Sequence, residues 1–194
     1  MKKSYSPPLA EEWVSNTLMN AGIIKPIDLI PERVAEAFGI IYERRPGISG
    51  SMVIDDCPMI LTDGRLDEPY QRKQFFHETG HILRHEGDQT VMPKSMREYQ
   101  EWDAELFAMY ASIPFHMIDF TQPYSIRSFM AEFTVTEELA TKRIDDIRQK
   151  IFCEQKRQQE KFVPIYTAFA LENCSDETKR MMEQLYRQTG TIFA

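Results

Sequence analysis

The stretch His77-Glu78-Thr79-Gly80-His81 decides the interpretation of this sequence, because it sets two histidines four residues apart with a glutamate beside the first. Residues i and i+4 share one face of a helix, so both imidazoles can bind one ion at about 2.0–2.1 Å. The glutamate is then placed to take a proton from a water molecule at that ion. The pattern is typical of zinc hydrolases.

The surrounding residues predict a helix at about 68–86 that is buried on one side. Phe75, Phe76, Ile82 and Leu83 recur at spacings that one side of a helix can bury. The two histidines then lie together on another side. This helical context favours a metal site over a chance match to a short motif.

A third ligand is expected downstream, because a catalytic zinc site usually has three protein ligands and one open position. The segment from Glu101 to Pro114 predicts a second helix, at about 97–113. Its expected inward residues are apolar: Trp102, Leu106, Met109 and Ile113. Glu101, 20 residues after His81, is the preferred ligand. Asp103 and Glu105 are alternatives that spacing leaves open.

Three stretches resemble the ImmA/IrrE zinc metallopeptidases. Residues 72–85 are similar to the family's Arg-Phe-x-x-x-His-Glu-x-Gly-His-x-x-x-His segment, with Lys73 in place of Phe. Residues 101–114 are similar to Glu-x-x-Ala-Asn-x-Phe-Ala and its Pro ending, with Glu105 in place of Asn. Residues 133–147 are similar to the helix Phe-x-Val-Ser-x-x-Ala-x-x-x-Arg-Leu, with Leu139 in place of Ala. Together the three are much more specific than the histidine motif alone.

The resemblance implies Zn²⁺ held by His77, His81 and Glu101, with Glu78 as the base that hydrolyses a peptide bond. It also implies the substrate, a helix-turn-helix transcriptional repressor whose cleavage releases genes of a mobile element, a prophage or a stress response. A different class of function is a non-catalytic repressor-binding protein with a structural or retired metal site. A third is hydrolysis of a small amide or peptide.

The fold class expected is α+β: a mainly helical, zincin-like core with a small antiparallel sheet and a C-terminal helical extension. Short apolar runs at 40–42, 51–54 and 58–61, separated by turn residues, predict the sheet. Other helices are expected at 9–20, 28–39, 126–133, 136–152 and 175–188. We expect a metallopeptidase domain at 1–118 and a helical region at 119–194 that packs on it.

Substrate contacts are less closely defined by the sequence. A strand edge at Met52–Ile54 or Met59–Leu61 could hold an extended peptide by main-chain hydrogen bonds. A further donor to the oxyanion is also expected, and the sequence does not choose among four downstream candidates. These are Tyr99, Tyr110, His116 and Tyr124. His85, one more turn along the first helix, is expected behind a ligand or at the surface rather than as a fourth ligand.

The net charge and the hydropathy of the sequence indicate which classes of partner the protein can bind. The net charge of −7 argues against nonspecific binding of nucleic acid through a basic face, and permits a basic protein partner. The sequence contains no apolar run of signal-peptide or membrane-spanning length. We therefore expect a cytoplasmic protein with no membrane partner. The oligomeric state is left open by these patterns.

Overall fold

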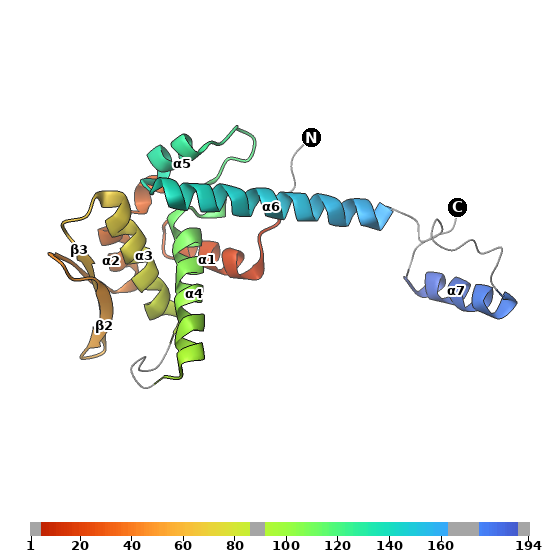
Figure 1. The fold of residues 1–194 in the computed structure, drawn as a ribbon, viewed down its shortest axis with the longest axis horizontal. Coiled ribbons are helices and arrows are strands. Elements are labelled where there is room, and N and C mark those ends of the chain that lie inside the picture. The colour runs from red at the N-terminus through yellow and green to blue at the C-terminus, as the bar shows by residue number, and fades with distance from the viewer. Residues whose placement is uncertain (1–4, 86–91, 163–174, 190–194) are drawn as a thin grey trace. The chain divides into compact units, whose positions relative to one another are not determined.

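The computed structural model describes residues 5–85, 92–162 and 175–189 (Figure 1). It divides into two compact units, Met1–Ile151 and Phe152–Ala194. The architecture is α+β, as predicted, with helices along the described chain and one small sheet near its N-terminal end. The expected division into a metallopeptidase domain at 1–118 and a helical region at 119–194 stays a prediction.

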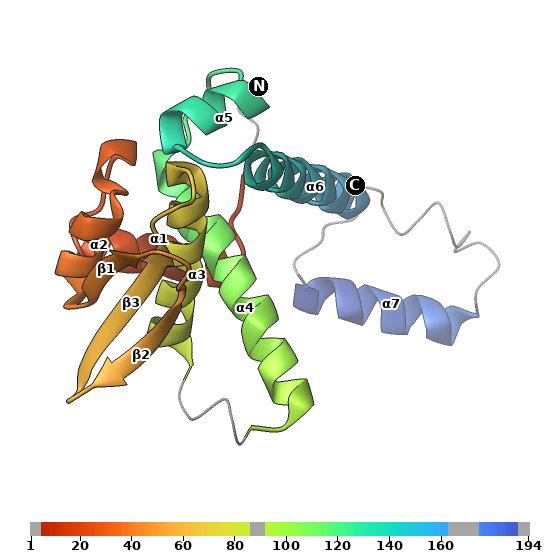
Figure 2. The same ribbon diagram turned by 60° about the vertical axis from the view of Figure 1, so that its left-hand side comes forward.

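The sheet contains β1 (Ile41–Arg45), β2 (Gly50–Ile54) and β3 (Cys57–Asp63) in the order β1-β3-β2 (Figure 2). β2 and β3 form an antiparallel hairpin, and both residues of its two-residue turn have positive φ, as a type I′ turn requires. β1 pairs with β3 in parallel. The sheet is therefore mixed, and the expected antiparallel pairing is wrong for β1. The reason is that β3 enters between β1 and β2, an order that turn residues do not encode.

Helix α3 (Glu68–Arg84) lies between the sheet and α4 (Lys94–Ser112), as Figure 2 shows. Both helices were predicted. Residue 86, the expected end of the first, lies outside the described residues, and the second begins three residues earlier than expected. Gly80 permits their close approach, because a Cβ there would lie only 3.1 Å from the Phe107 ring. This approach sets the distance between the candidate ligands.

The buried side of α4 differs in part from the one predicted, although Leu106 and Met109 pack against the core as expected. Trp102 is 59% exposed rather than inward, while Ile113, just past the helix, is fully buried. The buried side carries small residues together with two aromatic ones: Ala104, Phe107, Ala108, Tyr110 and Ala111. Small side chains let two helices pack closely, and a tryptophan at that contact would hold them apart.

Four of the remaining helices lie close to their predicted ranges: α1 (Leu9–Asn20), α2 (Pro31–Phe38), α5 (Ile126–Phe133) and α7 (Asp176–Thr189). α6 (Glu137–Phe162) runs ten residues past its expected end at 152, and the short helices η1 (Pro26–Asp28) and η2 (Phe115–Met117) were not predicted. α2 starts at Pro31 rather than at Asp28, because the Asp28 carboxylate instead accepts the N–H groups of Ile24 and Lys25 at 3.0 and 2.9 Å. In the described ranges no helix combines the length and apolarity that crossing a membrane requires.

A buried charge network joins α1 to α6 within the first unit. The guanidinium of Arg143 donates to Glu11, and both side chains are fully buried. Arg143 also donates to Asp146 at 2.7 Å and to the carbonyl of Ile113 at 3.1 Å. Lys150 donates to the second Glu11 oxygen at 2.9 Å. The apolar core around this network includes Val14, Leu18, Ile144 and Ile147.

Candidate metal centre

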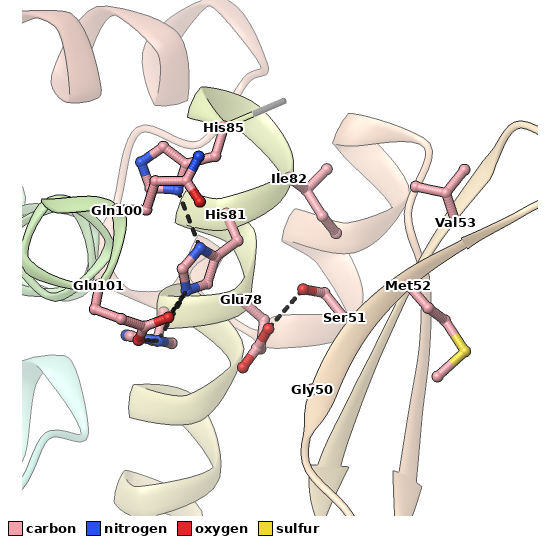
Figure 3. Close-up of a pocket in the computed structure, with 11 residues that line it drawn as sticks. Gly50, Ser51, Met52, Val53, Glu78, His81, Ile82, His85, Gln100 and Glu101 are labelled. Carbon is pink, nitrogen blue, oxygen red and sulfur yellow. Dashed lines mark hydrogen bonds and ion pairs between the residues drawn. The ribbon is translucent and has the colours of Figure 1, made fainter. Parts of the chain in front are cut away.

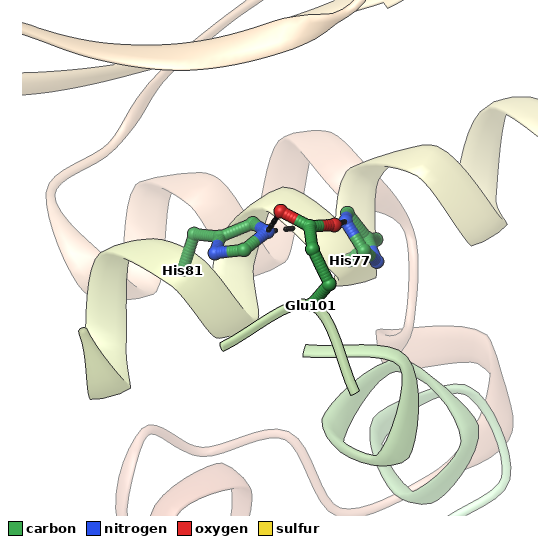
Figure 4. Close-up of side chains that lie close together, drawn as sticks. All are labelled: His77, His81 and Glu101. Atoms are coloured by element: carbon green, nitrogen blue, oxygen red, sulfur yellow. Dashed lines mark hydrogen bonds and ion pairs between the residues drawn. The ribbon is translucent and has the colours of Figure 1, made fainter. Parts of the chain in front are cut away.

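Three side chains from two helices converge on one point (Figure 4). His77 and His81 project from α3, with their Nε2 atoms 3.1 Å apart. Glu101 projects from α4, with one carboxylate oxygen 3.3 Å from His77 Nε2 and the other 3.5 Å from His81 Nε2. In a tetrahedral zinc site with bonds of 2.0–2.1 Å, neighbouring ligand atoms are about 3.3–3.4 Å apart. The donor set and its spacing therefore fit Zn²⁺.

The environment of His81 favours its metal-binding form. Their side chains are only 18% and 11% exposed, whereas Glu101 is 52% exposed. Burial lowers the pKa of His81, and the neighbouring His77 lowers it further. A histidine must be neutral to offer a lone pair to a metal. His81 is thus held in the form that a ligand requires.

Glu78 points from α3 toward the sheet rather than toward α4 (Figure 3). Its Oε2 accepts a 2.6 Å hydrogen bond from the hydroxyl of Ser51 on β2. A cavity of about 760 Å³ opens here between β2, α3 and α4, and Glu78 and all three candidate ligands line it. Its polar and apolar surroundings also include Val53, Ile82 and Gln100. A carboxylate held in place beside an open cavity can accept a proton from a water molecule inside it.

The strand beside the cavity has an open edge. β3 is the central strand, so of the two candidate strands only β2 offers an edge for an added peptide. Val53 lies opposite Pro58, which has no N–H to donate, so this pair is expected to be a non-hydrogen-bonded one. Pairs alternate along an antiparallel ladder. Ser51 and Val53 are therefore expected to direct their main-chain N–H and C=O groups away from β3.

Asp103, the first alternative ligand, lies behind the site. Its carboxylate accepts from Arg84 Nε and Nη2 at 2.5 and 2.8 Å and lies 3.0 Å from His85 Nε2. Burial raises the pKa of Asp103, but the hydrogen bonds and charge of Arg84 outweigh burial, so the pKa lies below its ordinary value. His85, for its part, lies behind His81, as expected. Its Nδ1 is 3.0 Å from His81 Nδ1.

Glu105, the second alternative, lies near the outer nitrogen of His77. Its Oε1 is 3.7 Å from His77 Nδ1, which is buried without a hydrogen-bond partner in the described part of the chain. The other Glu105 oxygen is 3.9 Å from Lys73 Nζ. Lys73 and Glu105, the departures from the family pattern in its first two stretches, are therefore neighbours of opposite charge. The charges fit one another across the α3–α4 contact.

The four candidate oxyanion donors lie away from the cavity. None of them is among the described residues that line it. Tyr99 is 59% exposed, with its ring 6.0 Å from that of Trp102. Tyr110 accepts from Lys150, His116 contacts the Ile23 carbonyl and Tyr124 stacks on Phe129. Ser51 and Gln100 are polar residues of the cavity that sequence reasoning missed. Neither belongs to the histidine motif, and no local pattern marks them.

Comparisons with known proteins show which family the chain is similar to. The profile of the IrrE N-terminal-like domain matches residues 30–145, more than half of the chain. The protein YqaB of Bacillus subtilis (strain 168) is 29% identical over 152 residues, which cover 76% of this chain and 88% of that protein. The phage-like element PBSX protein XkdA of the same strain is 30% identical over 142 residues, covering 70% of this chain and 71% of that protein.

A solved structure shares the fold. A transcriptional regulator of Mycobacterium tuberculosis superposes on 68% of this chain with a TM-score of 0.52 and 15% sequence identity. This chain spans 44% of that regulator's length. At this identity the likeness concerns the fold alone.

Proposed function

The chain belongs to the family of the IrrE N-terminal-like domain, and we propose that it is a zinc-dependent endopeptidase that cuts a helix-turn-helix transcriptional repressor. One observation carries the hydrolytic part of the proposal: three side chains with ligand atoms 3.1–3.5 Å from one another share a cavity with Glu78. A purely structural zinc site needs no such glutamate, and its four ligands close the site. The same observation argues against the repressor-binding alternative.

The side chains of this site divide the reaction between them. When bound, the zinc ion would act as a Lewis acid that polarises the scissile carbonyl and acidifies a water molecule. Glu78 takes the proton of the attacking water and returns it to the leaving amine. Ser51, which donates to one oxygen of Glu78, keeps the carboxylate turned to the cavity. The water oxygen bonds to the carbonyl carbon, the C–N bond breaks, and the proton carried by Glu78 passes to the departing amine.

The proposed substrate agrees with the charge and the relatives of the chain. A net charge of −7 favours the approach of a basic, DNA-binding protein over that of an acidic one. A relative from the phage-like element PBSX supports a mobile-element setting, in which cleavage of a repressor would release prophage or stress genes. A cytoplasmic repressor would place the enzyme in the cytoplasm.

Cleavage of the helix-turn-helix repressor encoded beside this chain tests the proposal. The purified full chain should cut the repressor at a defined peptide bond, which mass spectrometry of the fragments identifies. EDTA should abolish the cut, and one equivalent of zinc per chain should restore it. A repressor that is bound tightly but left intact by the zinc-loaded protein would instead support sequestration.

The open edge of β2 gives a prediction about substrate binding. Val53→Pro removes one outward N–H without removing a β2–β3 hydrogen bond, given the pairing expected opposite Pro58. Loss of one main-chain hydrogen bond to the substrate should raise KM about tenfold. Val53→Thr keeps the N–H and should leave KM near the wild-type value. Steady-state kinetics on a peptide spanning the cut site measure both. An unchanged KM for Val53→Pro would show that the substrate does not add to β2.

A further inference from the structure

A continuous polar chain runs outward from one candidate ligand. His81 Nδ1 lies 3.0 Å from His85 Nδ1, a contact marked in Figure 3, and His85 Nε2 lies 3.0 Å from Asp103. Arg84 holds the same carboxylate through two nitrogens, at 2.5 and 2.8 Å. The side chains of His85 and Asp103 are only 9% and 7% exposed. These hydrogen-bonded side chains link α3 to α4 directly behind the candidate metal centre.

The position of each proton follows from the donors and acceptors. A histidine that offers Nε2 to a metal carries its proton on Nδ1, so His81 is the donor in the contact between the two Nδ1 atoms. His85 must then accept at Nδ1 and carry its own proton on Nε2. That proton points at Asp103, which accepts it as an ionised carboxylate. In this arrangement the imidazole protons of His81 and His85 each meet an acceptor, and the metal on His81 Nε2 decides which nitrogen carries each proton.

We propose that His85 and Asp103, braced by Arg84, are positioning residues that fix the tautomer and ring orientation of His81 for metal binding. The inference rests on the proposed metal centre and gives Asp103 a place behind a ligand instead of a place on the metal. Ligand histidines are commonly held by a carboxylate on their outer nitrogen. Here an intervening histidine extends the reach of that carboxylate by one ring.

The group formed by His85, Asp103 and Arg84, called the brace below, is also held by a contact outside the site. The Arg84 guanidinium lies over the Trp13 ring of α1, 5.0 Å from its centroid, so the arrangement draws on three helices. His77 has no comparable support in the described residues, because its Nδ1 is buried without a hydrogen-bond partner and Glu105 is 3.7 Å away. The two ligand histidines therefore differ in how firmly they are oriented. His81 is the ligand whose ring orientation is fixed before metal binds.

Zinc affinity of the full chain, measured by chelator competition with zinc alone, tests this proposal. His85→Ala should weaken zinc binding by about 10- to 100-fold. His85→Gln should recover most of that loss, because a glutamine amide can accept from His81 and donate to Asp103 at once. His116→Ala removes a histidine that contacts the Ile23 carbonyl instead, and should leave the affinity unchanged. The glutamine variant keeps the test valid if the alanine variant folds poorly.

Imidazole nitrogen NMR of the zinc-bound protein supplies a second readout. The chain has four histidines, so single variants suffice to assign them. The proposal requires the proton of His81 on Nδ1 and that of His85 on Nε2. A proton on His85 Nδ1, or wild-type zinc affinity in His85→Ala, would overturn it.

His77→Ala and Glu101→Gln separate a failure of this inference from a failure of the metal centre. If these two variants lose zinc while His85→Ala keeps it, the metal centre stands and the brace is wrong. If neither of them changes zinc affinity, the centre itself is wrong, and the brace falls with it.

Discussion

Replacing Glu78 by glutamine is expected to abolish cleavage while leaving the metal bound. The substitution keeps the size of the side chain and removes its ability to take a proton. General-base catalysis contributes about 10²- to 10⁴-fold, so the cleavage rate should fall by that factor. The three candidate ligands are unchanged, so zinc content should stay at the wild-type level. Single-turnover cleavage of the repressor and metal analysis of the same preparations measure both quantities.

Glu98→Gln is a matched control for this variant. Glu98 is also a glutamate of the α3–α4 region, but it is exposed and pairs with Lys94 at 3.5 Å on α4. Its substitution should change neither rate nor metal content. If Glu78→Gln cuts at the wild-type rate, another group is the base. If both the zinc-loaded wild type and Glu78→Gln bind the repressor and neither cuts it, the protein acts by sequestration.

The largest effect on folding is expected at Arg143, far from the cavity in sequence and absent from the proposed reaction. Arg143→Met removes the guanidinium that donates to Glu11, Asp146 and the Ile113 carbonyl. Breaking a buried ion pair from one side destabilises a protein by about 3–5 kcal/mol. Urea unfolding in EDTA, which removes any contribution of bound metal, should show a loss of this size.

Two further variants show whether the cause is the unpaired charge. Arg148→Met acts on the same helix, but Arg148 is 67% exposed in its 3.5 Å pair with Asp145, so the change should be within about 0.5 kcal/mol of wild type. Adding Glu11→Gln to Arg143→Met removes the charge left without its guanidinium partner and should recover part of the stability. A loss below about 1 kcal/mol for Arg143→Met would contradict this account of the network.

The parts of the site that sequence could predict are those set by local spacing. His77 and His81 are one turn apart, and any regular helix brings them to one face. Glu101 required one more step, a return helix packed against the first, which the apolar pattern supplied. Their role as ligands remains a proposal, while their convergence is a property of the fold.

The parts that sequence could not predict depend on pairings between distant segments. Ser51 precedes Glu78 by 27 residues, and their contact exists because β2, at the edge of the sheet, packs against α3. The parallel pairing of β1 with β3 was missed for the same reason, because strand order is decided by packing rather than by turns. Trp102 was misplaced because hydrophobicity alone does not show which side of α4 is buried: Ala104, Ala108 and Ala111 are fully buried, while Trp102 is 59% exposed.

The most direct test of the central claim is an anomalous difference map, at the zinc absorption edge, of crystals of the full chain purified with zinc. The account predicts one strong peak within about 2.0–2.1 Å of His77 Nε2, His81 Nε2 and a Glu101 oxygen, with the fourth side open to the cavity beside Glu78. A peak that takes Asp103 as a ligand, or no peak between α3 and α4 while the protein carries one zinc per chain, would contradict it.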